Sequence, residues 1–479
     1  IGTIRTTAGD IRASVRTTTA FGTVTLLAAA RDLDVVTDIS AGIATMTAGR
    51  HIGNQSKPSV ILVRGNLGSV TAGGTLYNDI RIGNNLTGSI VLGGVSAKPG
   101  SNLVGNGSII AFGRLASVTV NGDFGGSIIS WSGGIGSVAI NNGSFYKDRT
   151  IAAYDGSIDS LVITSGHLLG NVHADRDITS LRVVGSADGI FGDVGINPAL
   201  SASVPYDALR NRLPAGVAPT IGKDGPSITA GRNITSFVVT DGSIFEATVW
   251  AGQSILTMQV NGGAANNGGT TSKATMIAAG DFLGNIAFSG GVNRAFFGAG
   301  VMSFGADNLP GGTGANADTV KSGTMNGISV GALNTVDFVA GVNAGADGLY
   351  IGGDDRTAIG VSLAQNIVVT GSVVNARLTS DGLAGGIDAR IVRASAERES
   401  TDAEFLAPGE TQLGTVVPAA GLTVNVGGVS TRITLSGPGR AAWDASTRTI
   451  SFTGTSGASA LRVERSEERR VGKECRSRW

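Results

Sequence analysis

The sequence predicts an all-β protein: a parallel β-helix, or solenoid, with coils of about 20 residues, plus a small C-terminal β unit. Three observations support this prediction. Glycine is abundant, short apolar sets return at a nearly fixed spacing, and no segment shows the apolar periodicity of a helix.

Composition sets the first limit on the fold. There are 75 glycines among 479 residues, about twice the usual share of roughly 7 %. Glycine is used where the backbone must turn or adopt a positive φ. Apolar residues make up 41 %, charged residues 15 % and aromatic residues 5 %. A disordered chain is less apolar than this, so the composition favours a fold with many turns and a thin aliphatic core.

The repeat is clearest between Ile158 and Val183, where an apolar set of three returns after about 20 residues. The two sets are Ile158, Leu161 and Ile163, followed by Ile178, Leu181 and Val183. Residues two apart on a strand share a face, so the last two members of each set point the same way. Similar sets begin at Leu115 and Ile135 and at Ile234 and Ile255.

The spacing favours stacked coils over separate sheets. About 10 residues separate successive strands, whereas an α-helical crossover between parallel strands needs a dozen or more. A coil of about 20 residues instead places each strand above its counterpart, and parallel pairing then buries one column of Ile, Val and Leu. Antiparallel hairpins in a sandwich or barrel are the alternative, although they would not require like residues at a fixed period of this length.

We expect the repeat array to cover residues 1–395. A proline-rich excursion is predicted at 191–227, where five of the chain's 11 prolines lie. Shorter excursions are predicted at 95–107 and 262–272, and a loop rich in Gly, Ala and Asn at 309–323. These segments interrupt the apolar period, so we interpret them as insertions that leave the side of the stack.

The C-terminal part differs in composition and lacks the repeat. A charge run and an Ala-Pro-Gly stretch predict a linker at 396–412. Alternating residues then predict a short β unit, or the start of a further array, at 413–464. The basic tail at 465–479 resembles a translated artefact, a genuine basic tail being the alternative, and it holds the single cysteine, Cys475. Because the chain also begins inside the repeat pattern, we expect it to be a fragment.

Charge and hydropathy argue against nucleic-acid binding and against a membrane-spanning helix. The 36 basic and 36 acidic residues give a net charge of zero, whereas nucleic-acid binding relies on a clustered positive surface. No stretch approaches the roughly 18 consecutive apolar residues that a membrane-spanning helix needs, so we predict no transmembrane segment.

Calcium is the one cofactor that the sequence suggests, as an alternative to a prediction of no cofactor. The segment GADGLYIGGDD at 345–355 and the Gly/Asp-rich segment at 305–318 resemble the calcium-binding nonapeptide repeats of RTX proteins. Calcium prefers several oxygen ligands, which Asp-bearing turns supply. The regular nonapeptide spacing is broken, and plain turns explain the segments equally well. The candidate ligands are Asp307, Asp318, Asp347, Asp354 and Asp355.

We predict that the chain is not an enzyme. The Gly-Asp-Asp segment at 353–355 faintly resembles the paired carboxylates of polygalacturonases, β-helices that hydrolyse pectin. That family needs a downstream histidine, and none follows His173. A metal pair of His167 and His173 lacks a third ligand. We therefore interpret these two histidines, with His51, as exposed turn residues, and keep a polysaccharide-degrading hydrolase or lyase as the alternative.

Over residues 1–395 the repeat resembles the β-strand repeats of bacterial extracellular proteins: filamentous-haemagglutinin-like adhesins, autotransporter passengers and the giant repeat exoproteins of planctomycetes. The resemblance rests on the texture of the repeat rather than on one motif. It implies a secreted or cell-surface protein with a structural or adhesive role. Side loops carrying Trp131 and Tyr206 would then contact a polysaccharide or a surface protein.

Overall fold

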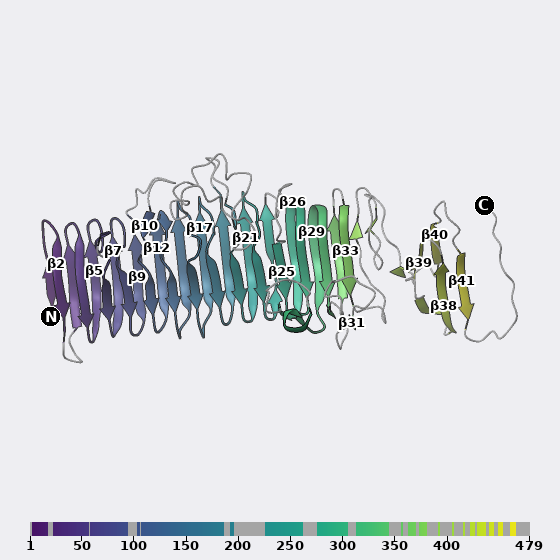
Figure 1. Cartoon of the computed structure of the whole chain (residues 1–479), viewed down its shortest axis with the longest axis horizontal. Coiled ribbons are helices and arrows are strands. Elements are labelled where there is room, and N and C mark those ends of the chain that lie inside the picture. Colours follow the sequence, from purple (N-terminus) through teal and green to yellow (C-terminus); the bar gives the residue numbers. More distant parts are fainter. Residues whose placement is uncertain are drawn as a thin grey trace.

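The structure is a computed structural model of the whole chain (Figure 1). It describes residues 2–17, 23–56, 58–93, 103–105, 107–185, 192–195, 226–261, 275–304, 313–343 and, beyond these, the strands from β31 onward whose bounds are given below. In this part of the chain the regular structure is β-strand, apart from the short 3-10 helix η1 (Gly314–Asn316). The all-β prediction is therefore confirmed.

Parallel strands form two long faces that stack coil upon coil (Figure 1). Face 1 consists of β1 (Thr3–Arg5), β3 (Thr23–Ala29), β5 (Gly42–Ala48), β7 (Asn66–Ala72), β9 (Leu86–Leu92), β12 (Leu115–Asn121), β15 (Ile135–Asn141), β17 (Ile158–Thr164), β19 (Ile178–Val184), β21 (Asn233–Thr240), β23 (Ser254–Ile255) and β24 (Met258–Asn261). Face 2 consists of β2 (Ile11–Arg16), β4 (Leu33–Ile39), β6 (Val60–Val63), β8 (Asp79–Ile82), β11 (Ile109–Ala111), β14 (Ile128–Ser130), β16 (Thr150–Ala153), β18 (Asn171–Ala174), β20 (Ser227–Ala230), β22 (Thr248–Ala251) and β25 (Thr275–Ala279).

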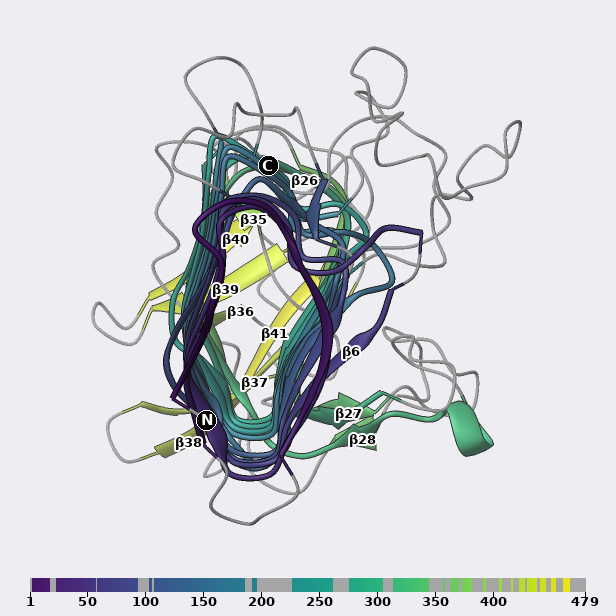
Figure 2. The same ribbon diagram turned by 90° about the vertical axis from the view of Figure 1, so that its left-hand side faces the viewer.

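A third, much narrower row of parallel pairs lies between the two faces. It consists mostly of single-residue bridges, and we call it the corner column. Its members are Leu33, Ile52 and Leu76 in the first coils, and Phe124, Phe145, Leu168, Val194 and Ile244 in later ones. The strand β10 (Leu103–Gly105) pairs with β13 (Asp123–Phe124) in the same row. Viewed along the stack, the coils superimpose in one narrow closed outline (Figure 2).

The predicted register is confirmed. In β17 and β19, Ile158 pairs with Ile178 and Leu161 with Leu181, so the coil has the predicted length. Other coils are longer, because residues are inserted between the same stacked positions. Ile178 pairs with Ile234 across a long insertion, most of which lies outside the described residues, yet the strands on either side still stack directly.

Beyond Ile244, the last residue of the corner column, two long strands continue the stack. β26 (Phe282–Ala299) pairs with β23 and β24 through its first half and with β25 through its last residues. β29 (Thr324–Ala340) stacks on β26 along its length, with one register shift. β32 (Leu363–Val369) and β33 (Val373–Ser380) then pair with the two halves of β29. Short strands β34 (Ile391–Val392) and β35 (Phe405–Leu406) continue the pairing from β32.

One aliphatic core runs through the stack. A single cluster of buried residues extends from Ile11 to Ile367. The corner column adds aromatic rings, since Phe124 and Phe145 stack with ring centroids 6.3 Å apart. Each fully buried aliphatic or Phe side chain stabilises the fold by about 1.5–3 kcal/mol, and inward residues two apart on every strand deliver that burial in each coil.

Tight corners explain much of the glycine content. A Cβ at Gly166 would lie 1.9 Å from the carbonyl oxygen of Gly143, and one at Gly143 would lie 2.2 Å from the carbonyl carbon of Gly122. The residue before each is left-handed, with φ of 55° at Asn142 and 53° at Ser165. The backbones of successive coils therefore approach so closely at this corner that only glycine fits.

A short hairpin covers part of the outer surface of face 2. It is formed by the antiparallel strands β27 (Val301–Ser303) and β28 (Thr319–Val320). The Trp250 Nε1–H donates a hydrogen bond to the carbonyl oxygen of Val301 at 3.0 Å. A second buried cluster lies under this hairpin, so an apolar outer patch of the stack is sealed by the chain itself.

The C-terminal β unit is also present. β36 (Thr415–Val416), β39 (Arg440–Asp444) and β40 (Thr449–Thr453) form one antiparallel sheet, and β37 (Leu422–Val426), β38 (Val429–Ser436) and β41 (Ala460–Arg465) form another. A further antiparallel pair joins β30 (Val342–Asn343) to β31 (Arg356–Thr357). Among the described residues, no helix has the length and apolarity needed to span a bilayer.

Candidate functional site

Of the residues proposed as calcium ligands or binding residues, two fall in the described part of the chain. Trp131 is half-exposed, and Asp318 is buried beside β28. The other candidates lie outside the described residues; they are Tyr206, Asp307, Asp347, Asp354 and Asp355. A calcium site formed by the five aspartates therefore stays a prediction. In the described ranges, no three His, Cys, Asp or Glu side chains are grouped so that they could hold a metal ion.

A row of polar side chains, which we call the corner ladder, lies beside the corner column. Apart from Asp10, which precedes the first residue of β2, its members immediately precede residues of that column, and each uses a side-chain atom to accept a hydrogen bond from a backbone N–H in the next coil. They are Asp10, Asp32 and His51 in the first coils, and Asp123, Ser144, His167 and Asp193 in later ones. The ladder thus satisfies backbone donors at a turn that has no continuous strand pairing.

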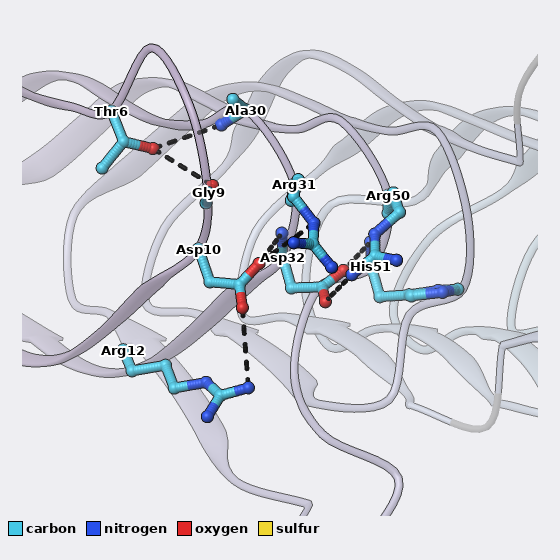
Figure 3. A network of polar contacts seen from close by, with 9 residues as sticks. All are labelled: Thr6, Gly9, Asp10, Arg12, Ala30, Arg31, Asp32, Arg50 and His51. Atoms are coloured by element: carbon cyan, nitrogen blue, oxygen red, sulfur yellow. Dashed lines mark hydrogen bonds and ion pairs between the residues drawn. The ribbon is translucent and has the colours of Figure 1, made fainter.

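The N-terminal part of the ladder is solvated and surrounded by arginines (Figure 3). Asp32 N–H donates to Asp10 Oδ1 at 3.2 Å, and His51 N–H donates to Asp32 Oδ1 at 3.2 Å. Arg31 and Arg50 pair with the two carboxylates from neighbouring turns. Burial acts to raise the pKa of Asp32, but the hydrogen bonds from Arg50 and the His51 N–H outweigh it and lower that pKa. Asp10 and Asp32 are therefore structural acceptors, and the lowered pKa keeps Asp32 ionised.

In the later part of the ladder Ser144, His167 and Asp193 are buried, and Asp123 is half-buried. His167 N–H donates to Ser144 Oγ at 3.0 Å, and Asp193 N–H donates to His167 Nδ1 at 3.3 Å. Asp193 Oδ1 in turn accepts from Ser243 N–H at 2.8 Å. Burial lowers the pKa of His167 to about 4, so the imidazole is neutral near neutral pH. Because Nδ1 accepts a hydrogen bond, we place the ring proton on Nε2.

The structure corrects the interpretation of two histidines, since His173 lies within strand β18 rather than in a turn. His167 was expected to be an exposed turn histidine, but its side chain is buried within the ladder. The residue does follow a turn glycine, which is why its sequence context looks exposed. Burial also raises the pKa of Asp123, although the hydrogen bonds from Ser144 N–H and the Tyr146 side chain oppose that shift. The side chains of this part of the ladder are engaged in hydrogen bonds between coils, so we assign it a structural role.

The second candidate site is an exposed row of aromatic side chains, which we call the aromatic strip. It comprises Phe112, Trp131 and Tyr154, with His173 beside them. Each of the first three directly follows a strand of face 2, and its N–H donates to the last residue of the face 2 strand one coil earlier, at 2.8–3.0 Å. Phe112 is 61 % and Trp131 50 % exposed, which is unusual among the large apolar residues that the structure describes.

Three rings of the strip, those of Trp131, Tyr154 and His173, pack in a row. Trp131 and Tyr154 stack with ring centroids 4.7 Å apart and planes inclined by 18°. The imidazole of His173 lies 5.4 Å from the Tyr154 ring. His173 is fixed in turn, because Nε2 lies 2.8 Å from Asp175 Oδ1 and Nδ1 lies 2.8 Å from Thr229 Oγ1. Packing and hydrogen bonds therefore hold the half-exposed indole on a rigid support.

Charged groups around the strip are paired. Arg114 contacts Asp159 at 2.7 Å, and Arg176 contacts Asp155 at 3.8 Å. The Asp155 N–H donates to Asp175 Oδ2 at 2.7 Å. That hydrogen bond, opposed by burial and aided by His173, lowers the pKa of Asp175. Asp175 is therefore an anion at neutral pH.

The sequence singled out Trp131 but not its neighbours. The interval from Phe112 to Trp131 is shorter than the interval from Trp131 to Tyr154, so the three rings fall in register only once the coil lengths are known. A usable signal was present, since each follows the last residue of a short strand.

Comparison with known proteins gives no further guide to the site. No family model, curated protein or solved structure matches this chain.

Proposed function

We propose that this protein is a structural or adhesive rod of a secreted or cell-surface bacterial protein. The observation that carries the proposal is the uninterrupted parallel stack, in which one core joins coils from Ile11 to Ile367. Such a stack resists local opening, because each coil is paired with the coil before and the coil after it. The resemblance to bacterial β-strand repeat proteins supports the proposed location.

The adhesive part of the proposal rests on the aromatic strip. Soluble proteins expose single apolar side chains often, but contiguous exposed aromatic residues commonly mark binding surfaces. Here Phe112 and Trp131 are exposed in adjacent coils on a rigid scaffold. The proposal assigns no catalytic residue.

Binding of the full chain to arrays of polysaccharides, extracellular-matrix proteins and bacterial surface fractions tests the proposal. We expect binding to at least one class and release of no product from any polysaccharide. An absence of binding to every array would contradict the adhesive role and leave the structural one. Product release would contradict the proposal as a whole and support the enzymatic alternative.

A further inference from the structure

We infer that the aromatic strip binds a neutral polysaccharide, with Trp131 as the stacking residue and the carboxylates of Asp155 and Asp175 as hydrogen-bond acceptors for sugar hydroxyls. The inference rests on the proposed adhesive function and names its ligand class. It is carried by the half-exposed Trp131 ring, by the charge around the strip and by the arrangement of the rings.

Trp131 offers an aromatic surface that the fold does not use. One side of the indole is stacked on Tyr154, and among the described residues no second ring packs on it. Half of the residue stays exposed. The C–H groups of a pyranose ring form an apolar face of similar size, and burying that face against an indole removes apolar area from water on both partners.

The charge around the strip selects against polyanions. The carboxylate of Asp155 follows Tyr154 in the chain, that of Asp175 contacts His173, and the guanidinium group beside them, that of Arg176, is paired with Asp155. A nucleic acid or an acidic polysaccharide would place further negative charge beside these carboxylates. A neutral sugar instead donates hydrogen bonds from its hydroxyl groups to such carboxylates.

The same carboxylates could attract a cationic peptide, but the ring geometry argues against that ligand. Cation-binding sites surround the charge with ring faces. Trp131 and Tyr154 are instead inclined by only 18° and cover one another. Arg176 already pairs with Asp155, and His173 with Asp175. These carboxylates can still accept hydrogen bonds from a ligand, but their charge is already opposed by neighbouring groups.

The dimensions fit a polymer better than a single sugar. Successive coils are about 4.8 Å apart, so Phe112, Trp131 and Tyr154 mark three steps along the rod axis. An extended glycan chain laid along that axis would reach the exposed Phe112 ring beyond Trp131. A chain of several sugars would therefore gain more contact than a monosaccharide.

Calorimetric titration of the full chain with neutral hexasaccharides tests the inference; the probes are cellohexaose, laminarihexaose, xylohexaose and mannohexaose. We expect at least one to bind, and Trp131→Ala to raise its Kd about tenfold or more, as truncation of a central aromatic contact does. Trp131→Tyr should restore most of the affinity. Leu256→Ala is the matched control, because Leu256 is an exposed apolar residue outside the strip, and it should leave Kd unchanged.

Three results would overturn the inference: no binding of any neutral hexasaccharide, equal affinity of the wild type and Trp131→Ala, or tighter binding of polygalacturonate or polylysine. Thermal unfolding of Trp131→Ala should match the wild type, which separates loss of contact from loss of fold. If the chain still binds a protein on the surface arrays while ignoring all neutral glycans, the ligand class is wrong and the adhesive function stands.

Discussion

The buried histidine of the corner ladder makes the stability of the stack depend on pH. The pKa of His167 is about 4 in the folded chain, against 6.5 for an unperturbed histidine. The unfolded state therefore takes up a proton first as the pH falls. The stability associated with the neutral imidazole is complete above pH 6.5 and is lost between pH 6.5 and 4.

The size of the effect follows from the pKa difference. Each unit corresponds to about 1.4 kcal/mol, so the full loss below pH 4 is about 3 kcal/mol, and about 2 kcal/mol is already lost at pH 5. In His167→Asn the amide oxygen can still accept the hydrogen bond from Asp193 N–H, but the side chain does not titrate. The free energy of unfolding of this variant, relative to that of the wild type, should therefore be about 2 kcal/mol higher at pH 5 than at pH 7.5.

Urea unfolding followed by circular dichroism at the two pH values measures the difference. Ser243→Ala is the matched control, because it changes another polar residue of the same corner without removing a titrating group, and its pH dependence should parallel that of the wild type. Parallel pH dependence of His167→Asn and wild type would refute the reasoning, since it would mean that His167 protonates as readily in the fold as outside it.

Three further substitutions test the packing of the stack by thermal or urea unfolding. Gly166→Ala places a Cβ 1.9 Å from a backbone oxygen and should destabilise by about 1–3 kcal/mol or more, whereas Gly2→Ala, with nothing within 4 Å, should not; equal effects would contradict the close-approach argument. Phe145→Ala in the corner column should remove about 3–5 kcal/mol, and a smaller loss would show that the core closes over the cavity. Asp193→Ala leaves the Ser243 N–H without this acceptor and should remove about 1–3 kcal/mol, while a fully neutral effect would argue against the ladder.

The sequence predicted the faces of the stack because each inward position repeats its residue type. Ile158 lies under Ile178 and Leu161 under Leu181, and a shift of one residue would turn these side chains outward. Chemical identity and spacing therefore specify the same register. The register can therefore be assigned from the sequence without knowing the lengths of the turns.

The corner ladder could not be predicted in the same way. Its later members are Asp123, Ser144, His167 and Asp193, which are of three residue types and are separated by unequal intervals. Any side chain with an acceptor atom can accept a hydrogen bond from the N–H of the next coil. Several residue types can therefore occupy a ladder position, and no recognisable motif results. The aromatic strip was missed for a related reason, because insertions change the spacing between coils.

Crosslinking within the stack tests the central claim that successive coils lie directly above one another. The Ser117 and Ser137 hydroxyls are 3.0 Å apart on neighbouring coils, and Ser160 lies one coil further on. In a Cys475→Ser background, Ser117→Cys with Ser137→Cys should form a disulfide under mild oxidation, detected by peptide mass mapping. Ser117→Cys with Ser160→Cys should not, since two coils separate them by about 10 Å. Crosslinking of the second pair but not the first would contradict the stacked register.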